Sequence, residues 1–279
     1  MNAARTFRRE VVKGLALLLA CVAPVARGEE LPLWELGVGA AGISFPDYRG
    51  SSRQRGYVLP VPVFAYRGEV FQVDREKLRG LLFRSERVEV ELSVSGSVPV
   101  RSSDNPAREG MPDLDPTLEA GPSLNFRLAQ SQRRTLRLRL PVRALIASDF
   151  HSVHGAGVVA NPNLSLDVRL DQGWRLGLVA GVLFGDRRNH GYYYGVAPEF
   201  ARAGRPAYDA PAGYSGAQAI VALSKRFGPW LVGGFVKHDF LEGAAFEASP
   251  LLERRNNVSA GIAFIWTFAQ SEKRVTVRD

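Results

Sequence analysis

The chain of 279 residues has a single cysteine, Cys21, and no apolar run that approaches the roughly 20 residues of a membrane-spanning helix. Because Cys21 is the single cysteine, the rest of the chain can form neither an internal disulfide nor a zinc site built from thiolates. Without a long apolar run, any insertion into a bilayer must use β-strands. We expect no metal and no cofactor.

Clustered positive charge is also lacking. The formal net charge is +8, but half of it comes from residues 1–28, which hold five basic residues and one acidic residue. The remaining 31 basic and 27 acidic residues are interspersed along the chain. A nucleic-acid-binding surface would concentrate its basic residues on one element. We therefore expect no nucleic-acid partner.

The N-terminal 28 residues are typical of an export signal. Basic residues precede an apolar stretch, 14–25, that is too short to cross a bilayer as a helix, and Ala26-Arg27-Gly28 places small residues where a signal peptidase reads them. Cleavage before Glu29 is the first interpretation. The alternative is a lipobox around Leu18-Leu19-Ala20-Cys21, in which Cys21 would become lipidated.

What the chain does have is repeated alternation of apolar and charged residues. It is clearest in 88–92, 136–140 and 164–170, where every second residue is aliphatic and many of the others are Glu, Arg or Asp. Successive side chains of a strand point to opposite faces, so each segment has one apolar side and one polar side. A soluble β-sandwich also alternates, but this many charged faces after an export signal favour a bilayer-spanning barrel with a polar lumen.

The predicted fold is therefore all-β, a single-chain antiparallel transmembrane barrel of about twelve strands (10–12) in one domain, 29–268, followed by a charged tail, 269–279. Residues 192–196 are expected to form a short strand or part of a loop, and Pro141 is expected to cause a bulge. Short turns at 131–134, 171–173 and 227–229 alternate with long loops at 101–115, 147–156, 185–215 and 241–257. The predicted strands are 34–45, 57–66, 69–73, 78–83, 88–98, 117–128, 135–146, 157–170, 174–184, 217–226, 230–240 and 259–268.

Several short motifs resemble the MipA/OmpV family of outer-membrane proteins. They include residues 45–51 (FPDYRGS), 192–196 (YYYGV), 204–208 (GRPAY) and the closing strand 261–268 (GIAFIWTF). The resemblance implies a barrel in the Gram-negative outer membrane that serves as a scaffold between a lytic transglycosylase and a bifunctional penicillin-binding protein. It implies no catalytic residues. One departure is the tail after Phe268, since such barrels usually end in an aromatic residue.

Three groups of residues are candidates for function. A turn with Asp149, His151, Ser152 and His154 could suggest a hydrolase or a metal clip, but no Gly-x-Ser-x-Gly elbow is present and an exposed polar loop is the simpler interpretation. A second group is predicted to line the lumen, either as the selectivity lining of a pore or as ion pairs that fill it. Its members are Glu89, Glu91, Glu119, Arg127, Arg137, Arg139, Arg143, Asp167, Arg169 and Arg175.

The third group is a candidate partner-binding surface, because Tyr and Arg are frequent interface anchors. It consists of Tyr192, Tyr193, Tyr194, Arg202, Arg205 and Tyr208. The same tyrosines could instead mark a membrane interface. We expect a non-enzymatic outer-membrane scaffold whose partners are lipid, a periplasmic murein hydrolase and a penicillin-binding protein. The alternative is a small-solute channel or adhesin with the same fold.

Overall fold

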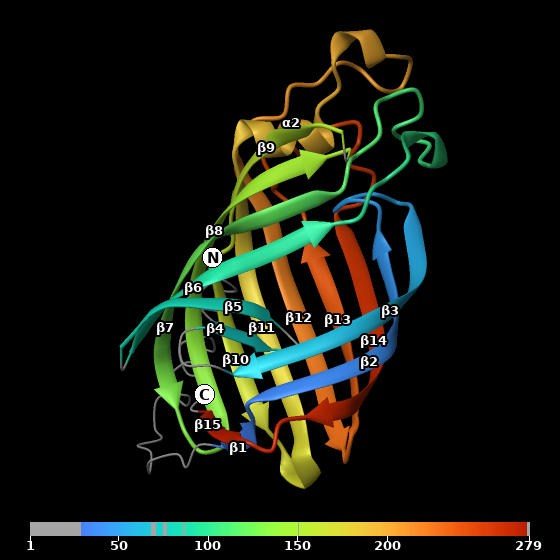
Figure 1. Cartoon of the computed structure of the whole chain (residues 1–279). Coiled ribbons are helices and arrows are strands. Elements are labelled where there is room, and N and C mark those ends of the chain that lie inside the picture. The colour runs from blue at the N-terminus through green and yellow to red at the C-terminus, as the bar shows by residue number, and fades with distance from the viewer. Residues whose placement is uncertain (1–28, 68–70, 75–76, 86, 150, 278–279) are drawn as a thin grey trace, which may run out of the picture.

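The structure is a computed structural model that describes residues 29–67, 71–74, 77–85, 87–149 and 151–277; the predicted signal peptide and Cys21 lie outside these ranges. Figure 1 shows long, tilted strands arranged around a common axis, with loops gathered at one end. The strands are β1 (Glu29–Pro32), β2 (Trp34–Pro46), β3 (Gln54–Arg67), β4 (Phe71–Asp74), β5 (Lys77–Arg84), β6 (Val88–Ser97), β7 (Thr117–Gln130), β8 (Arg134–Ser148), β9 (Val153–Ala160), β10 (Asn163–Arg169), β11 (Trp174–Gly185), β12 (Gly213–Phe227), β13 (Trp230–Phe240), β14 (Asn256–Gln270) and β15 (Arg274–Val277).

The strand pairings of the described residues form a closed antiparallel ring. Strand β14 pairs with β2, and each strand from β2 to β8 pairs with the next. The upper half of β8 pairs with β9 and its lower half with β10, so β9 and β10 act as one interrupted strand, and β10 then pairs with β11. Counting β9 and β10 together, the ring has twelve strands. The predicted barrel of twelve strands is confirmed.

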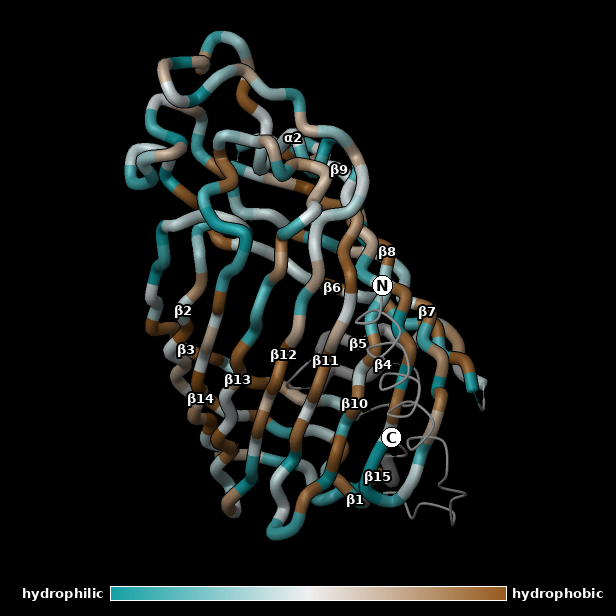
Figure 2. The backbone as a smooth tube through the Cα atoms, turned by 180° about the vertical axis from the view of Figure 1, so that it is seen from behind, coloured by the Kyte–Doolittle hydropathy of each residue, from teal (hydrophilic) through white to brown (hydrophobic). Residues whose placement is uncertain are grey.

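The two faces of each strand differ as the alternation predicts. On β14, Val258, Ile262 and Phe264 are about half exposed on the outside, whereas Asn257, Ser259 and Thr267 are buried on the inside. Figure 2 shows hydrophobic residues alternating with polar ones along the strands. A barrel that exposes this many large apolar side chains on its outer face can keep them from water only inside a bilayer. At the lower edge of this belt, Trp230 stacks on Trp266 with ring centroids 6.0 Å apart, as in an interfacial girdle.

The loops show which end of the barrel faces which side. The connections after β2, β6, β11 and β13 are long and lie at the upper end in Figure 1, whereas the turns after β7, β10 and β12 at the lower end are short. The described terminal segments, β1 and β15, pair with each other at the lower end. Outer-membrane barrels have short periplasmic turns and longer extracellular loops. The lower end therefore faces the periplasm.

Residues 274–277 of the predicted tail form β15, which pairs with β1. Three local expectations need correction. The alternative of a short strand at 192–196 is wrong, since α2 (Arg187–Tyr194) ends there. The loop predicted at 147–156 shrinks to 149–152 because β8 and β9 extend into it. The register of β7 and β8 runs unshifted past Pro141, and β9 instead shifts opposite Leu145 and Ile146, beside Gly157, whose φ of +107° favours glycine.

No helix among the described residues is long and apolar enough to span a membrane.

Candidate functional site

The long loops at the extracellular end fold together into a cap with its own apolar core. The loops contribute side chains that are almost fully buried, including Phe246, Leu241 and Leu251 at 0% exposure. Such a core requires the loops to hold one arrangement, because each apolar side chain is removed from water by residues of the other loops. We call this assembly the cap. The buried members of its core are Tyr48, Val100, Leu114, Tyr194, Val196, Ala210, Leu241, Ala244, Phe246 and Leu251.

Helix α2 carries the tyrosine run into the cap. Asp186 caps its N-terminus by accepting a hydrogen bond from the backbone N–H of Asn189. Tyr194 stacks on Phe246 with ring centroids 3.6 Å apart and donates its hydroxyl to the carbonyl of Arg49 at 2.8 Å. Burial raises the pKa of the Tyr194 hydroxyl, which therefore stays a neutral donor. The tyrosines thus join three loops that are far apart in sequence.

The arginines of the predicted partner-binding surface also hold the cap together. Arg205 is 5% exposed and donates to the carbonyls of Phe200, Ala107 and Glu109 at 2.8 to 3.2 Å. Tyr194 is 4% exposed. Neither Arg205 nor Tyr194 is available to a partner, which corrects the expectation for these two residues. The partly exposed Tyr192, Tyr193, Arg202 and Tyr208 remain candidates, but on the extracellular side.

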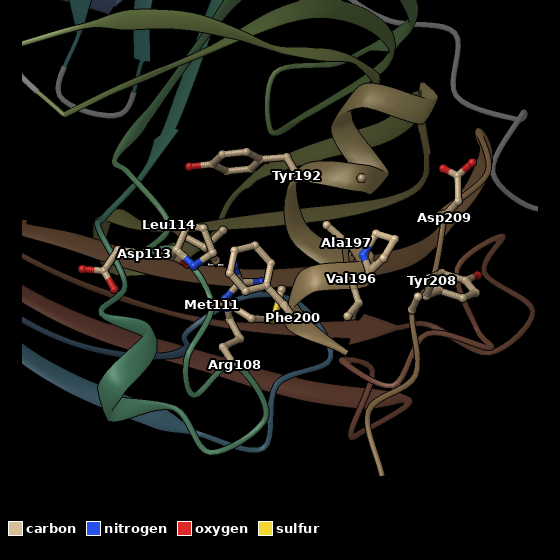
Figure 3. A pocket seen from close by; sticks show the side chains of 15 residues that line it. Arg108, Met111, Asp113, Leu114, Tyr192, Val196, Ala197, Phe200, Tyr208 and Asp209 are labelled. Carbon is tan, nitrogen blue, oxygen red and sulfur yellow. Dashed lines mark hydrogen bonds between the residues drawn. The ribbon is translucent and has the colours of Figure 1, made fainter. Parts of the chain in front are cut away.

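A shallow cavity of about 570 Å³ opens between these loops (Figure 3). Tyr192, Phe200 and Tyr208 contribute its aromatic wall, and Asp113 and Asp209 contribute carboxylates. The guanidinium of Arg108 closes one side and donates to the carbonyls of Tyr193 and Pro112 at 3.2 and 3.3 Å. The N–H groups of Arg108 are directed to the protein. Apart from the carboxylates of Asp113 and Asp209, the cavity therefore offers mainly apolar surface to a ligand.

His190 is a fully buried ionisable group of the cap. Its side chain is fully buried, with Nδ1 2.6 Å from the carbonyl oxygen of Pro211 and Nε2 2.6 Å from Ser215 Oγ. Burial lowers the pKa of His190 below its ordinary value of 6.5, against the opposing effects of the Pro211 carbonyl and the Asp186 carboxylate. The folded cap therefore holds a neutral imidazole at neutral pH.

This burial predicts that the cap loses stability in acid. The unfolded chain binds a proton at His190 at a higher pH than the folded chain, so the free energy of unfolding falls as the pH drops below 6.5 towards the lowered pKa. Limited proteolysis of the cap at pH 7.5 and pH 5 measures this change. His154→Gln should keep the difference and His190→Gln should reduce it; an equal difference in both variants would contradict the assignment.

The predicted lumen-lining residues all lie on inward-facing positions of β6, β7, β8, β10 and β11. Arg127 pairs with Glu89 at 3.0 Å, Arg143 with Glu119 at 2.8 Å and Arg137 with Asp167 at 2.8 Å, each pair joining neighbouring strands. Glu91 accepts a hydrogen bond from the amide of Asn125 at 2.8 Å. The remaining three are Arg139, Arg169 and Arg175. In the strand register Arg139 lies opposite Asn125, and Arg175 lies between Arg169 on one side and Ser224 on the other, all on the inward face. One half of the lumen wall is therefore charged, with both signs present.

The opposite half of the lumen wall is largely apolar. Inward positions of β12, β13, β14, β2 and β3 carry mostly small or aliphatic residues, with Phe235 over Gly261. At its lower edge Arg226 pairs with Glu35 at 2.8 Å. At its upper edge Asp239 is 1% exposed and binds Arg49 at 2.8 Å and Lys237 at 3.1 Å.

Sequence reasoning missed Asp239, Arg49 and His190. Alternation along β13 does place Lys237 and Asp239 on one face, which was a usable signal. Arg49 lies 190 residues away, and no local pattern reveals that distant contact.

The turn with Asp149 is a local hydrogen-bonded structure. The Asp149 carboxylate accepts from the backbone N–H groups of His151 and Ser152 and from Ser152 Oγ, at 2.6 to 3.0 Å. These bonds lower the pKa of Asp149. His154 lies against the ring of Tyr192 with centroids 6.2 Å apart. No cluster of three or more metal-ligating side chains occurs in the part of the chain that the structure describes.

A closed antiparallel ring with an apolar exterior, a lumen wall that is charged on one half, and short turns at the end that carries β1 and β15 defines an outer-membrane β-barrel protein. The chain belongs to the MltA-interacting protein MipA family, whose model matches residues 38–268.

Solved structures give a looser similarity. An outer membrane channel from Pseudomonas putida F1 is 12% identical with a TM-score of 0.44, covering 89% of this chain and 100% of that one. The NanC porin is 7% identical with a TM-score of 0.37, covering 84% and 100%. The outer membrane phospholipase A of Escherichia coli is 11% identical with a TM-score of 0.31, covering 87% and 98%. No curated protein matches the chain.

Proposed function

We propose that the protein is a non-enzymatic scaffold in the outer membrane that holds a lytic transglycosylase and a bifunctional penicillin-binding protein at its periplasmic end. The observation that carries the proposal is the match of residues 38–268 to a family described as MltA-interacting. We further propose that residues 1–28 direct export and are removed.

Orientation decides which surface such partners can use. The cap faces away from the periplasm, so a periplasmic enzyme cannot reach its tyrosines and arginines. The accessible surface is the lower end, with the turns after β7 and β10 and the ribbon of β1 and β15. Arg133 and Asp171 form an exposed ion pair there, 69% and 81% exposed. Charged, exposed turns of this kind suit a reversible contact.

Absence of catalysis is part of the proposal. Ser152 hydrogen-bonds to Asp149 rather than to a histidine, and Asp149 is engaged by three donors of its own turn. A nucleophilic serine needs a base within hydrogen-bond reach. The turn is accounted for by its local hydrogen bonds.

The proposal is tested by capture of periplasmic murein enzymes on the detergent-solubilised full chain. We expect enrichment of a lytic transglycosylase and a penicillin-binding protein over an unrelated barrel. Arg133→Glu should lower the enrichment about tenfold, since a 1.4 kcal/mol loss at a charged contact has that effect. Tyr208→Ala in the cap is the matched control and should leave it unchanged. Absence of enrichment on the wild-type chain would reject the scaffold and leave the channel or adhesin.

A further inference from the structure

The barrel wall has a long unpaired stretch beside β3. Strand β3 pairs with β2 along its full length, from Gln54 to Tyr66. On its other side, the described pairs with β4 involve only Tyr66 and Arg67. The edge of β3 from Gln54 to Ala65 therefore meets no strand among the residues that the structure describes.

The facing strand, β6, is unpaired in the same region. It pairs with β7 from Val88 to Ser97, but with β5 only from Glu89 to Leu92. Residues 93–97 thus present a second free edge within the described chain. We call the interval between the free edges of β3 and β6 the seam; Figure 1 shows these two strands at the front with β12, β13 and β14 behind them.

The seam is closed at both ends. At its lower end the hairpin of β4 and β5 bridges β3 and β6. At its upper end the loop after β6 crosses to the β2–β3 turn, where the amide of Asn105 donates to Asp47 at 2.8 Å and to Ser51 at 3.1 Å. An unpaired interval bounded by specific contacts above and below has the form of a window.

Two prolines keep the β3 edge of the seam unpaired. Pro60 and Pro62 lie opposite Ala40 and Val38 of β2, and the register continues on both sides of them. Proline has no N–H, so the ladder bonds to β2 must come from residues 59, 61 and 63, and the prolines direct their nitrogens to the seam. Removing two donors from an edge disfavours the addition of another strand. This edge is thus adapted to remain open.

The seam lies at the depth of the apolar belt. The register aligns Pro60 with Ala40 and Phe264, and Pro62 with Val38 and Trp266. On the outer face Val58 is 83% exposed and Phe64 is 51% exposed. Both residues are apolar, so the outer side chains of β3 contact acyl chains, whereas its unpaired backbone groups must be hydrated from the lumen.

On the β3 side, the inner rim of the seam is apolar as well. Leu59 and Val61 of β3 point inward, and Leu59 is 44% exposed although it faces the lumen. The predicted charged lumen residues lie on β6 to β11. On the β6 side of the seam the inward residues are Ser93 and Ser95, and Ser93 Oγ accepts a hydrogen bond from Arg143 at 3.3 Å. Along β3 an apolar surface therefore runs from the lumen, past Leu59, to the lipid-facing Val58.

We propose that the seam is a lateral passage through which an uncharged apolar small molecule moves between the lumen and the bilayer core. Such a molecule fits because the outer end of the seam opens onto acyl chains, where a charged or strongly polar solute would be costly. A partner β-strand fits less well, because the prolines remove donors that strand addition requires. The proposal is independent of the scaffold function.

Cysteine labelling tests whether the seam connects lumen and lipid. With Cys21 replaced by serine the chain has no other cysteine, so single-cysteine variants are unambiguous. In vesicles, a membrane-partitioned pyrene maleimide should modify Leu59→Cys at a rate close to that of the outward Val58→Cys. It should modify the matched inward Ile220→Cys, on the fully paired β12, about tenfold more slowly. Equal rates at positions 59 and 220, or protection of position 59 in native membranes by a bound strand, would overturn the proposal.

Hydrogen exchange and uptake complete the test. Amides of Gly56, Val58 and Phe64 should exchange fast, whereas those of Leu59, Val61 and Val63 should be protected by β2.

In cells that produce the protein, uptake of the apolar dye N-phenylnaphthylamine should fall about fivefold with Leu59→Lys, because a charge then lies in the passage. Uptake should stay unchanged with the control Ile220→Lys. Uniform protection of both amide sets, or equal uptake by both lysine variants, would exclude a passage.

Discussion

Replacing Asp239 by alanine is expected to lower the free energy of unfolding by about 3 kcal/mol, because it leaves two cations inside the barrel without their carboxylate. Asp239 is 1% exposed and binds Arg49 at 2.8 Å and Lys237 at 3.1 Å. Arg49 and Lys237 keep 21% and 25% of their side chains exposed, so some hydration remains and the loss stays at the lower end of the usual range. Urea unfolding in lipid vesicles measures it.

The exposed pair of Arg133 and Asp171 provides the control for this measurement. Its carboxylate is 81% exposed, and ion pairs in water contribute about 0 to 1 kcal/mol. Asp171→Ala should therefore leave the unfolding midpoint nearly unchanged. If Asp239→Ala were as mild as Asp171→Ala, water would have to reach Arg49 and Lys237 freely, and the upper lumen could not be the closed environment that the burial of Asp239 indicates.

The barrel could be predicted from sequence because its determinant is local. Alternation with a period of two places side chains on opposite faces whatever lies across the ladder, so β13 was predicted at 230–240 and runs over Trp230–Phe240. The same argument placed Glu89, Arg137 and Asp167 in the lumen. It could not tell which acid meets which base, since that depends on the register between strands.

The cap could not be predicted because its determinants are tertiary. The sequence RRNHGYYY has a glycine and three aromatics, and no apolar periodicity marks it as a helix. It becomes helical because Asp186 caps it and because Tyr194 and His190 pack against Phe246, which lies 52 positions beyond Tyr194 in the chain. The segments 29–32 and 274–277 were likewise missed, because each is too short to show a pattern and pairs only with the other.

The seam and the cap are expected to divide the barrel into parts of different stability. Strands β11 to β14 and β2 are paired on both sides, whereas β3 and β6 are paired on one side only over much of their length. The cap ties the top of the seam through Asn105, so loss of cap structure should also loosen the upper part of β3. Local unfolding of this kind occurs without global unfolding of the remaining strands.

Replacing Phe246 by alanine is expected to unfold the cap locally while leaving the barrel folded. Phe246 is fully buried, stacks on Tyr194 at 3.6 Å and meets the edge of His190 at 4.8 Å, so its removal leaves a cavity between three loops. Phe→Ala changes in cores cost about 3–5 kcal/mol, which would raise the open fraction of the cap by roughly a hundredfold or more. Limited proteolysis should then cut the cap loops, while the heat-dependent shift of the barrel on gels persists. Phe246→Leu keeps most of the volume and should have a much smaller effect; equal effects of the two changes, or collapse of the barrel together with the cap, would contradict an independent apolar core in the loops.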